Sequence, residues 1–148
     1  MLPALSSLPL TSLRFVYCRG LSDLGPLKGL PLTSLEFQYC AKVKDLSPLK
    51  SLPLKVLHIW GASTERLQLE DLSPLKGMSI EDLAVTYSSV SDLSPLKGMP
   101  LKRLSIEGST SVVDIRPLKG MPLKWLKVPV SVSDLSPVNR IEGLQLER

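Results

Sequence analysis

The chain has 148 residues, of which 43% are hydrophobic, and it carries a formal net charge of +4. This length is typical of one domain that can bury a substantial core. No stretch approaches the length of apolar sequence that spans a membrane, and the N-terminus lacks the basic and apolar regions of a signal peptide. The basic residues are not gathered into one run, which argues against nucleic acid as a partner.

One short phrase recurs along the chain. The octapeptide DLSPLKGM stands at residues 71–78 and again at 92–99, and related phrases begin at Asp23, Asp45, Asp114 and Asp134. Their prolines are spaced by 22, 26, 21, 22 and 20 residues, which is a solenoid period with one insertion. A seventh, degenerate copy near the N-terminus has Ala4 in the proline position. The spacing predicts an array of stacked repeats.

A second element follows each phrase and alternates apolar with variable residues, as a short strand does. The expected strands begin, in chain order, at Leu10, Leu32, Leu54, Ile80, Leu101, Leu123 and Ile141. Phe15 and Phe37 occupy core positions in the first two. The pattern therefore predicts seven short strands, one for each repeat.

Each phrase is expected to form one 3-10 turn, because too few residues separate it from the next strand for a long helix. Leu93 and Leu96 are expected to point into the core, and Gly98 is expected to close the turn. In four copies a serine precedes the proline, which is the arrangement of an N-cap and a first helical residue. These serines are Ser47, Ser73, Ser94 and Ser136.

The chain resembles the leucine-rich repeat proteins. Their pattern, L-x-x-L-x-L-x-x-N/C-x-L, is matched by LTSLRFVYCRGL and LTSLEFQYCAKV, with Cys18 and Cys40 in the Asn/Cys slot. Later copies depart from the pattern in this slot, where they carry Ala62, Ser88, Ser109 and Ser131. The phrase that follows is most similar to the class with about 22 residues per repeat, which includes bacterial internalin-like and SDS22-like repeats.

The resemblance implies an α/β fold in the form of a right-handed solenoid. A parallel sheet of about seven short strands is expected on its concave face, with 3-10 turns and loops on its convex face. Residues 1–148 are expected to form a single leucine-rich repeat domain of about six full repeats and a terminal partial repeat. Exposed strand edges tend to pair with other chains, so weak self-association through the terminal repeats is also expected.

In the family the slot of Cys18 and Cys40 faces the interior and bonds the loop backbone, which implies two buried free thiols. A disulfide between the two cysteines is the alternative, although parallel side chains on adjacent repeats give it poor geometry. Free thiols fit a reducing compartment. A cytoplasmic location is therefore expected, and a mature secreted fragment is the alternative.

Two charged columns follow from the repeat. The aspartates would stack about 5 Å apart, so their carboxylates are expected to accept backbone N–H groups in the turn or to pair with lysines. The second column consists of Lys28, Lys50, Lys76, Lys97 and Lys119. We interpret this column as a solvent-exposed stripe whose lysines pair with the aspartates, and binding of an anionic partner is the alternative. It contains no interleaved aromatic residues, which argues against single-stranded nucleic acid.

The sequence offers no arrangement for catalysis or for metal binding. His58 is the single histidine, and its outward position on the third strand predicts an exposed side chain or a contact in a binding face. No phosphate-binding, dinucleotide-binding or metalloprotease motif is present. Two cysteines are too few to hold zinc. We therefore expect no enzyme activity, no cofactor and no metal.

The aromatic residues outside the core predict the functional surface. Exposed aromatic residues are enriched at protein–protein contacts, whereas stacked tyrosines could instead form a ladder that stabilises neighbouring repeats. Mixed charge around them favours a protein partner over nucleic acid. The expected binding residues on the concave face are Tyr17, Tyr39, His58, Trp60, Tyr87, Arg103 and Trp125.

We therefore expect a non-enzymatic protein–protein interaction scaffold that binds a partner protein through its concave face. The alternative is the regulatory or sensory repeat fragment of a larger protein, such as a bacterial protein kinase. One repeat is about four residues longer than the others, with Leu67 and Leu69 still able to supply the core. Its projecting residues, Ser63–Arg66, form either a binding loop or a harmless insertion.

Overall fold

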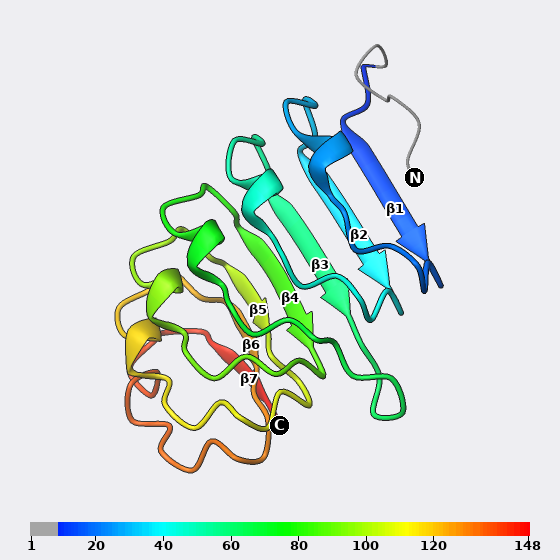
Figure 1. The fold of residues 1–148 in the computed structure, drawn as a ribbon. Helices are drawn as coiled ribbons and strands as arrows, with labels where there is room; N and C mark the ends of the chain where they lie inside the picture. Colours follow the sequence, from blue (N-terminus) through cyan, green and yellow to red (C-terminus); the bar gives the residue numbers. More distant parts are fainter. Residues whose placement is uncertain (1–8) are drawn as a thin grey trace.

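A computed structural model describes residues 9–148, which form one all-parallel sheet of seven strands (Figure 1). The strands follow one another across the sheet in chain order, as in a solenoid with one strand per repeat. They are β1 (Ser12–Val16), β2 (Ser34–Gln38), β3 (Val56–Trp60), β4 (Asp82–Thr86), β5 (Arg103–Ser105), β6 (Trp125–Lys127) and β7 (Gln145–Glu147). The prediction of seven short parallel strands is confirmed, whereas the degenerate copy around Ala4 lies outside the described residues.

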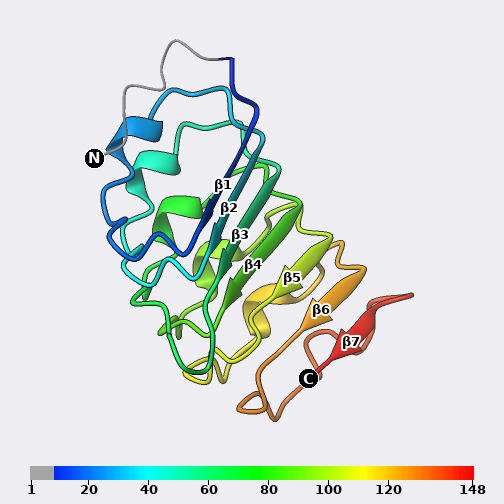
Figure 2. The same ribbon diagram turned by 90° about the vertical axis from the view of Figure 1, so that its right-hand side faces the viewer.

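The repeated phrases form one-turn 3-10 helices on one side of the sheet. These are η1 (Gly25–Leu27), η2 (Ser47–Leu49), η3 (Ser73–Leu75), η4 (Ser94–Leu96) and η5 (Arg116–Leu118). Figure 2 shows the turns on one side of the strands and, for the described residues 9–148, no further layer on the other side. We call this open side the uncovered face; it corresponds to the concave face of the prediction.

The core fills the space between the sheet and the turns. Leu93 and Leu96 are 1% and 0% exposed, which confirms that these leucines of the phrase point inward. Phe15 and Phe37 pack on the same core and stack on each other, with ring centroids 5.3 Å apart. Gly98 follows η4 with φ +75°, a left-handed conformation that glycine adopts without strain. The phrase is therefore repeated because each copy packs against the next.

The aspartate of each phrase, rather than the serine, caps the turn. Asp92 Oδ1 accepts the backbone N–H of Ser94 at 2.8 Å, and the Ser94 hydroxyl donates to Asp92 Oδ2 at 2.7 Å. The predicted serine N-cap is wrong, because Ser94 is already the first residue of η4 and uses its hydroxyl to hold the aspartate. The same hydrogen bond, from the backbone N–H two residues later to the aspartate carboxylate, recurs at Asp23, Asp45, Asp71, Asp114 and Asp134.

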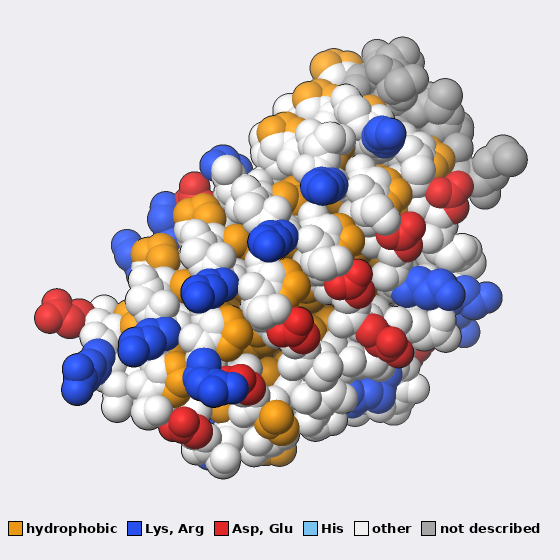
Figure 3. All heavy atoms as spheres, turned by 60° about the vertical axis from the view of Figure 1, so that its left-hand side comes forward, with side chains coloured by type: hydrophobic (Ala, Val, Ile, Leu, Met, Phe, Trp, Pro, Cys, Tyr) orange, Lys and Arg blue, Asp and Glu red, His pale blue; other side chains and the backbone are white. Residues whose placement is uncertain are grey.

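The lysine column lies on the same side of the molecule as the turns, where Figure 3 shows a row of basic side chains beside a row of acidic ones. Within residues 9–148, none of Lys28, Lys50, Lys76, Lys97 and Lys119 forms an ion pair. Of the two expected roles of the aspartates, acceptance of backbone N–H groups is confirmed, and pairing with the lysine column is wrong. The physical reason is that each aspartate carboxylate turns back onto its own turn.

The slot of Cys18 and Cys40 faces the loop backbone, and both thiols are free. Cys40 is buried and donates to the carbonyl oxygen of Gln38 at 3.4 Å, and burial raises the pKa of its thiol. Cys18 belongs to the outermost described repeat and is only half-buried, so the prediction of two buried thiols is confirmed for Cys40 alone. Ser109 fills the same slot and donates to the carbonyl oxygen of Val85 at 3.1 Å.

The longer repeat projects as a tight turn while its flanks remain in the core. Ala62 and Glu65 exchange backbone hydrogen bonds of 3.1 Å in both directions, which closes a short loop. Leu67 and Leu69 are 1% and 0% exposed, as predicted. The insertion therefore changes the loop at the edge of the sheet without disturbing the packing of the repeat.

The capping aspartates predict acid sensitivity. The side chain and the backbone N–H of Arg116 donate hydrogen bonds to the Asp114 carboxylate and lower its pKa to about 2. Hydrogen bonds within the turns also lower the pKa of Asp92 and Asp134. A carboxyl whose pKa is lower in the folded state stabilises the fold above its unfolded pKa of about 3.9 and loses this effect as the pH falls through the folded value. Urea midpoints are therefore expected to fall steeply between about pH 4 and pH 2.

The variant Asp114→Asn is the matched control, because its amide oxygen can still accept the backbone N–H of Arg116 but does not titrate. It is expected to be less stable than the parent at pH 6 and to match it below about pH 2. A stability difference that stayed constant over this range would contradict the role assigned to the Asp114 carboxylate.

Candidate functional site

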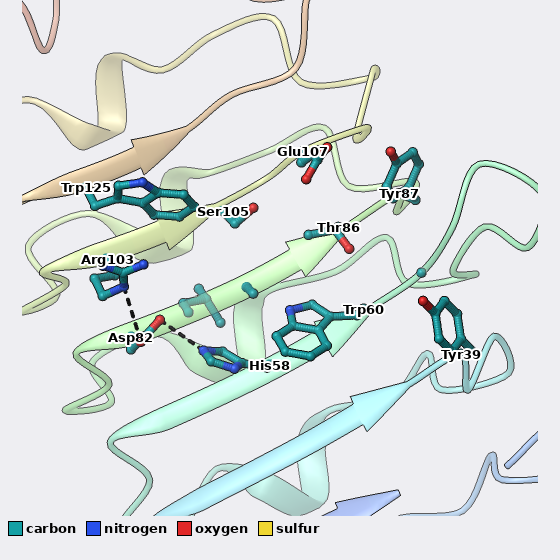
Figure 4. Close-up of a pocket in the computed structure, with 13 residues that line it drawn as sticks. Tyr39, His58, Trp60, Asp82, Thr86, Tyr87, Arg103, Ser105, Glu107 and Trp125 are labelled. Atoms are coloured by element: carbon teal, nitrogen blue, oxygen red, sulfur yellow. Dashed lines mark hydrogen bonds and ion pairs between the residues drawn. The ribbon is translucent and has the colours of Figure 1, made fainter. Parts of the chain in front are cut away.

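The uncovered face carries a hollow of about 330 Å³ above strands β3 to β6 (Figure 4). Its floor consists of small side chains on β4 and β5: Ala84, Thr86 and Ser105, which are 5%, 7% and 7% exposed. The flanking strands β3 and β6 instead carry Trp60 and Trp125, which rise around this floor. The hollow therefore arises from a difference in side-chain size between neighbouring strands.

The structure brings most of the predicted binding residues together at this hollow. Six of the seven line it: Tyr39, His58, Trp60, Tyr87, Arg103 and Trp125. Tyr17 lies outside the hollow and stacks on Tyr39, with ring centroids 4.8 Å apart. The sequence analysis missed Ala84, Thr86 and Ser105, because a small side chain carries no chemical signal. Comparing side-chain size between neighbouring strands could have found them, because these small residues stand at outward positions beside strands that carry tryptophan.

His58 lies deeper in this surface than its sequence position predicts. Its side chain is 18% exposed, so the expectation of an exposed residue is wrong. The ring stacks on Trp60, with centroids 5.2 Å apart, and Nε2 lies 3.0 Å from Asp82 Oδ1. Both contacts follow from strand geometry, because residues two apart share a face and Asp82 lies on the next strand. His58 therefore supports the indole of Trp60 from one side.

The charged groups around the hollow are engaged with one another. Asp82 lies between His58 and Arg103, whose Nε is 3.6 Å from Asp82 Oδ2. The Arg103 guanidinium also lies 4.7 Å from the centroid of the Trp125 ring. Lys127 Nζ lies 3.3 Å from Glu107, and this contact raises the pKa of Lys127. Because the rim charges are balanced in this way, the hollow offers a partner mainly aromatic surface.

Three tyrosines beside the hollow hold an unusual backbone conformation. Tyr17, Tyr39 and Tyr87 have φ values of 54°, 56° and 51°, in the left-handed region. This conformation costs a non-glycine residue about 1–2 kcal/mol. Each tyrosine follows the last residue of its strand and donates its backbone N–H to the next repeat. Glycine would avoid this cost, so the tyrosine side chain itself has a role at these positions.

Tyr17 allows the ladder interpretation to be tested, because its side chain is 63% exposed and its main aromatic contact is Tyr39. Replacing Tyr17 by glycine removes a stacking contact of about 0.5–1.5 kcal/mol and relieves strain of similar size. The free energy of unfolding is therefore expected to change by less than about 0.5 kcal/mol in urea denaturation.

The control is Tyr17→Ala, which loses the stacking contact but keeps the strained backbone. It is expected to be about 1 kcal/mol less stable than Tyr17→Gly, the reverse of the usual order of these residues in regular structure. A loss above about 1.5 kcal/mol in the glycine variant would show that the stacked tyrosine rings mainly stabilise the fold.

Other kinds of site were sought in the same part of the chain. Among residues 9–148, no three His, Cys, Asp or Glu side chains lie close enough together to hold a metal ion. No helix in this range has the length and apolar character needed to cross a membrane. What the arrangement provides is a cluster of aromatic faces with a balanced polar rim.

The sequence matches no protein-family model and no curated protein. Solved structures show clear similarity: the chain superposes on internalin C2 from Listeria monocytogenes with 28% identity and a TM-score of 0.57. The match covers 84% of this chain and 66% of internalin C2. Internalin F from the same organism matches with 26% identity and a TM-score of 0.48, over 86% of this chain and 50% of that protein. The chain thus corresponds to about two thirds of the first and half of the second.

Proposed function

We propose that this chain, a leucine-rich repeat protein, is a non-enzymatic scaffold that binds a partner protein through its uncovered, concave face. The observation that carries the proposal is the gathering of six outward residues, four of them aromatic, around one hollow. Aromatic residues and arginine are the side chains most enriched among binding hot spots. A hollow with aromatic walls and a polar rim also has the composition of the centre of a protein interface.

The dimensions of the face support the same proposal. Seven strands span about 29 Å at the usual spacing of about 4.8 Å, which is long enough for an extended peptide or the side of a helix. The hollow lies near the middle of this span, over β3 to β6. Hot-spot residues cluster near the centre of an interface, where surrounding contacts exclude water. The position of the hollow is the one that a central anchor would need.

The balance of charge favours a protein over a polyanion on this face. Arg14 pairs with Glu36, Arg103 with Asp82, and Lys127 with Glu107, so the basic groups already have acidic neighbours. Binding to nucleic acid depends on free basic groups that neutralise phosphates. The lysines of the column, which form no ion pair within residues 9–148, instead lie beside the turns on the opposite side.

A display library of small folded domains would test this proposal. Binders selected on the parent chain are expected to lose most of their affinity for Trp60→Ala and Trp125→Ala and to retain it for Lys97→Ala. The lysine variant is a matched control, because Lys97 is exposed on the opposite side. Binders that depended on the lysine column and ignored both tryptophans would contradict the proposed face.

A further inference from the structure

The tyrosines of the uncovered face form a row with one open place. Tyr17, Tyr39, Gly61 and Tyr87 occupy equivalent positions in the hydrogen-bond ladder, because each follows the last residue of its strand and donates its backbone N–H to the next repeat. Gly61 lacks the positive φ of the three tyrosines. The acceptors are the carbonyl oxygens of Gln38, Trp60, Thr86 and Glu107. Tyr17 and Tyr39 fill adjacent places with rings 4.8 Å apart, close to one strand spacing. Gly61 occupies the next place and contributes no ring.

The chain cannot fill this place with a side chain of its own. A Cβ at Gly61 would lie 2.9 Å from the carbonyl oxygen of Thr86, 3.0 Å from Cγ of the buried Leu67 and 3.2 Å from the Cβ of Tyr87. The first of these atoms belongs to the backbone of the adjacent strand, so it cannot move aside. Close packing of β3 against β4 therefore requires glycine here, and the gap in the row is a consequence.

A second glycine in the row, Gly108, marks a place that a neighbouring tyrosine ring occupies. Gly108 follows Tyr87 in the row, and a Cβ there would lie 2.3 Å from Cδ1 of the Tyr87 ring. The ring of Tyr87 thus covers the place at Gly108. At Gly61 a Cβ would instead meet the backbone of β4 and the buried Leu67 side chain. Gly61 therefore presents only its backbone to the hollow that it lines.

The walls of this place are suited to a flat group. Tyr39 and Tyr87 lie two repeats apart, a separation of about 9.6 Å at normal strand spacing. A planar ring needs about 3.5–4 Å on each face, so one ring fits between the two positions. Figure 4 shows Tyr39, Trp60 and Tyr87 around the C-terminal end of β3. All three residues line the hollow.

The charges around the hollow decide between an aromatic and a cationic occupant. A cation could lie against the aromatic faces, but no carboxylate of the rim is free to balance its charge: Asp82 is shared by His58 and Arg103, and Glu107 is paired with Lys127. An uncharged ring displaces none of these contacts and gains stacking on both sides. We propose that the gap at Gly61 receives one aromatic side chain of the partner protein. This inference rests on the proposed function and specifies its anchor.

Small probes would test the anchor directly. N-acetyl-phenylalaninamide, N-acetyl-leucinamide and N-acetyl-argininamide would each be titrated into the ¹⁵N-labelled chain while the Gly61 and Thr86 amide signals are followed. The phenylalanine probe is expected to shift both signals with an affinity about 5-fold above that of the other two probes, from the added stacking. Preference for the arginine probe would overturn the inference, and so would the absence of any shift with the phenylalanine probe.

Two tyrosine variants provide a matched comparison. Tyr39→Leu removes a wall of the gap, whereas Tyr17→Leu removes the ring one repeat away, at a position with nearly the same backbone conformation. The affinity for the phenylalanine probe is expected to fall about 5-fold in Tyr39→Leu and to change less than about 2-fold in Tyr17→Leu. Equal effects of the two substitutions would contradict a site at Gly61. Amide spectra of both variants would show that each remains folded.

The inference and the proposed function can fail separately. If display-selected binders depend on Trp60 and Trp125 but the phenylalanine probe does not bind, the binding face stands and the aromatic anchor is wrong. If the probe binds at Gly61 while the selected binders ignore both tryptophans, the proposed protein-binding face is wrong. Each result rejects one statement without reference to the other.

Discussion

Replacing Leu96 by alanine is expected to lower the free energy of unfolding by about 2–5 kcal/mol, the usual cost of removing a buried leucine side chain. Leu96 ends η4 and is 0% exposed. Its side chain packs in the single core that runs through the array. In a solenoid each repeat contacts only its neighbours, so a cavity in one repeat weakens two interfaces that the rest of the fold cannot replace.

Lys97→Ala is the control for this experiment, because Lys97 is the next residue, is exposed and forms no ion pair in the described part of the chain. Its stability is expected to change by less than about 0.5 kcal/mol. Urea denaturation followed by circular dichroism would measure both values. Similar losses in the two variants would mean that the inward and outward positions of the phrase have been confused.

Replacing Trp60 by alanine is expected to weaken binding of a selected partner by about 2 kcal/mol or more, as removal of a hot-spot residue does. Trp60 lies in the wall of the hollow, is supported on one side by His58 and points away from the core. Stability is expected to fall by much less than the affinity, because the core of leucine, isoleucine and valine side chains is untouched. Titration calorimetry and thermal melts on the same variant would give both numbers.

The ladder interpretation predicts the opposite outcome for Trp60→Ala and for Tyr39→Ala. If outward aromatic residues served mainly to join neighbouring repeats, both variants would melt several degrees lower and bind normally. Tyr39→Ala separates the two interpretations most sharply, because Tyr39 both stacks on Tyr17 and lines the hollow. A variant that lost stability and kept its affinity would show that the tyrosine row serves the fold.

The repeat pattern was enough to predict the architecture. A fixed phrase and a period-2 segment in each repeat fix where strands, turns and inward leucines lie, because each copy must pack on the next. The same pattern did not show which side chain caps the turn. Ser94 was expected to cap η4, but it is the first residue of η4, and its own backbone N–H donates to Asp92 two residues earlier. Spacing alone does not show which of two polar side chains, two residues apart, bonds to the backbone of the turn.

The candidate site was predicted less completely. Tyr39, Trp60 and Trp125 were found because large outward side chains are conspicuous in the sequence, whereas the hollow depends on small residues that lie between them. The burial of His58 follows from contacts with Trp60 and Asp82. The gap at Gly61 required knowing that backbone from the neighbouring strand excludes a Cβ. Such features depend on distances between repeats and not on the order of residues within one.

Mapping the contact surface of a selected binder by hydrogen–deuterium exchange tests the central claim most directly. The account predicts slower exchange on binding at the ends of β3 and β4 and in the segment around Gly61, with no change in the turns that carry the lysine column. Protection confined to η1–η5 and the adjoining lysines would contradict it, because the partner would then occupy the side opposite the aromatic hollow.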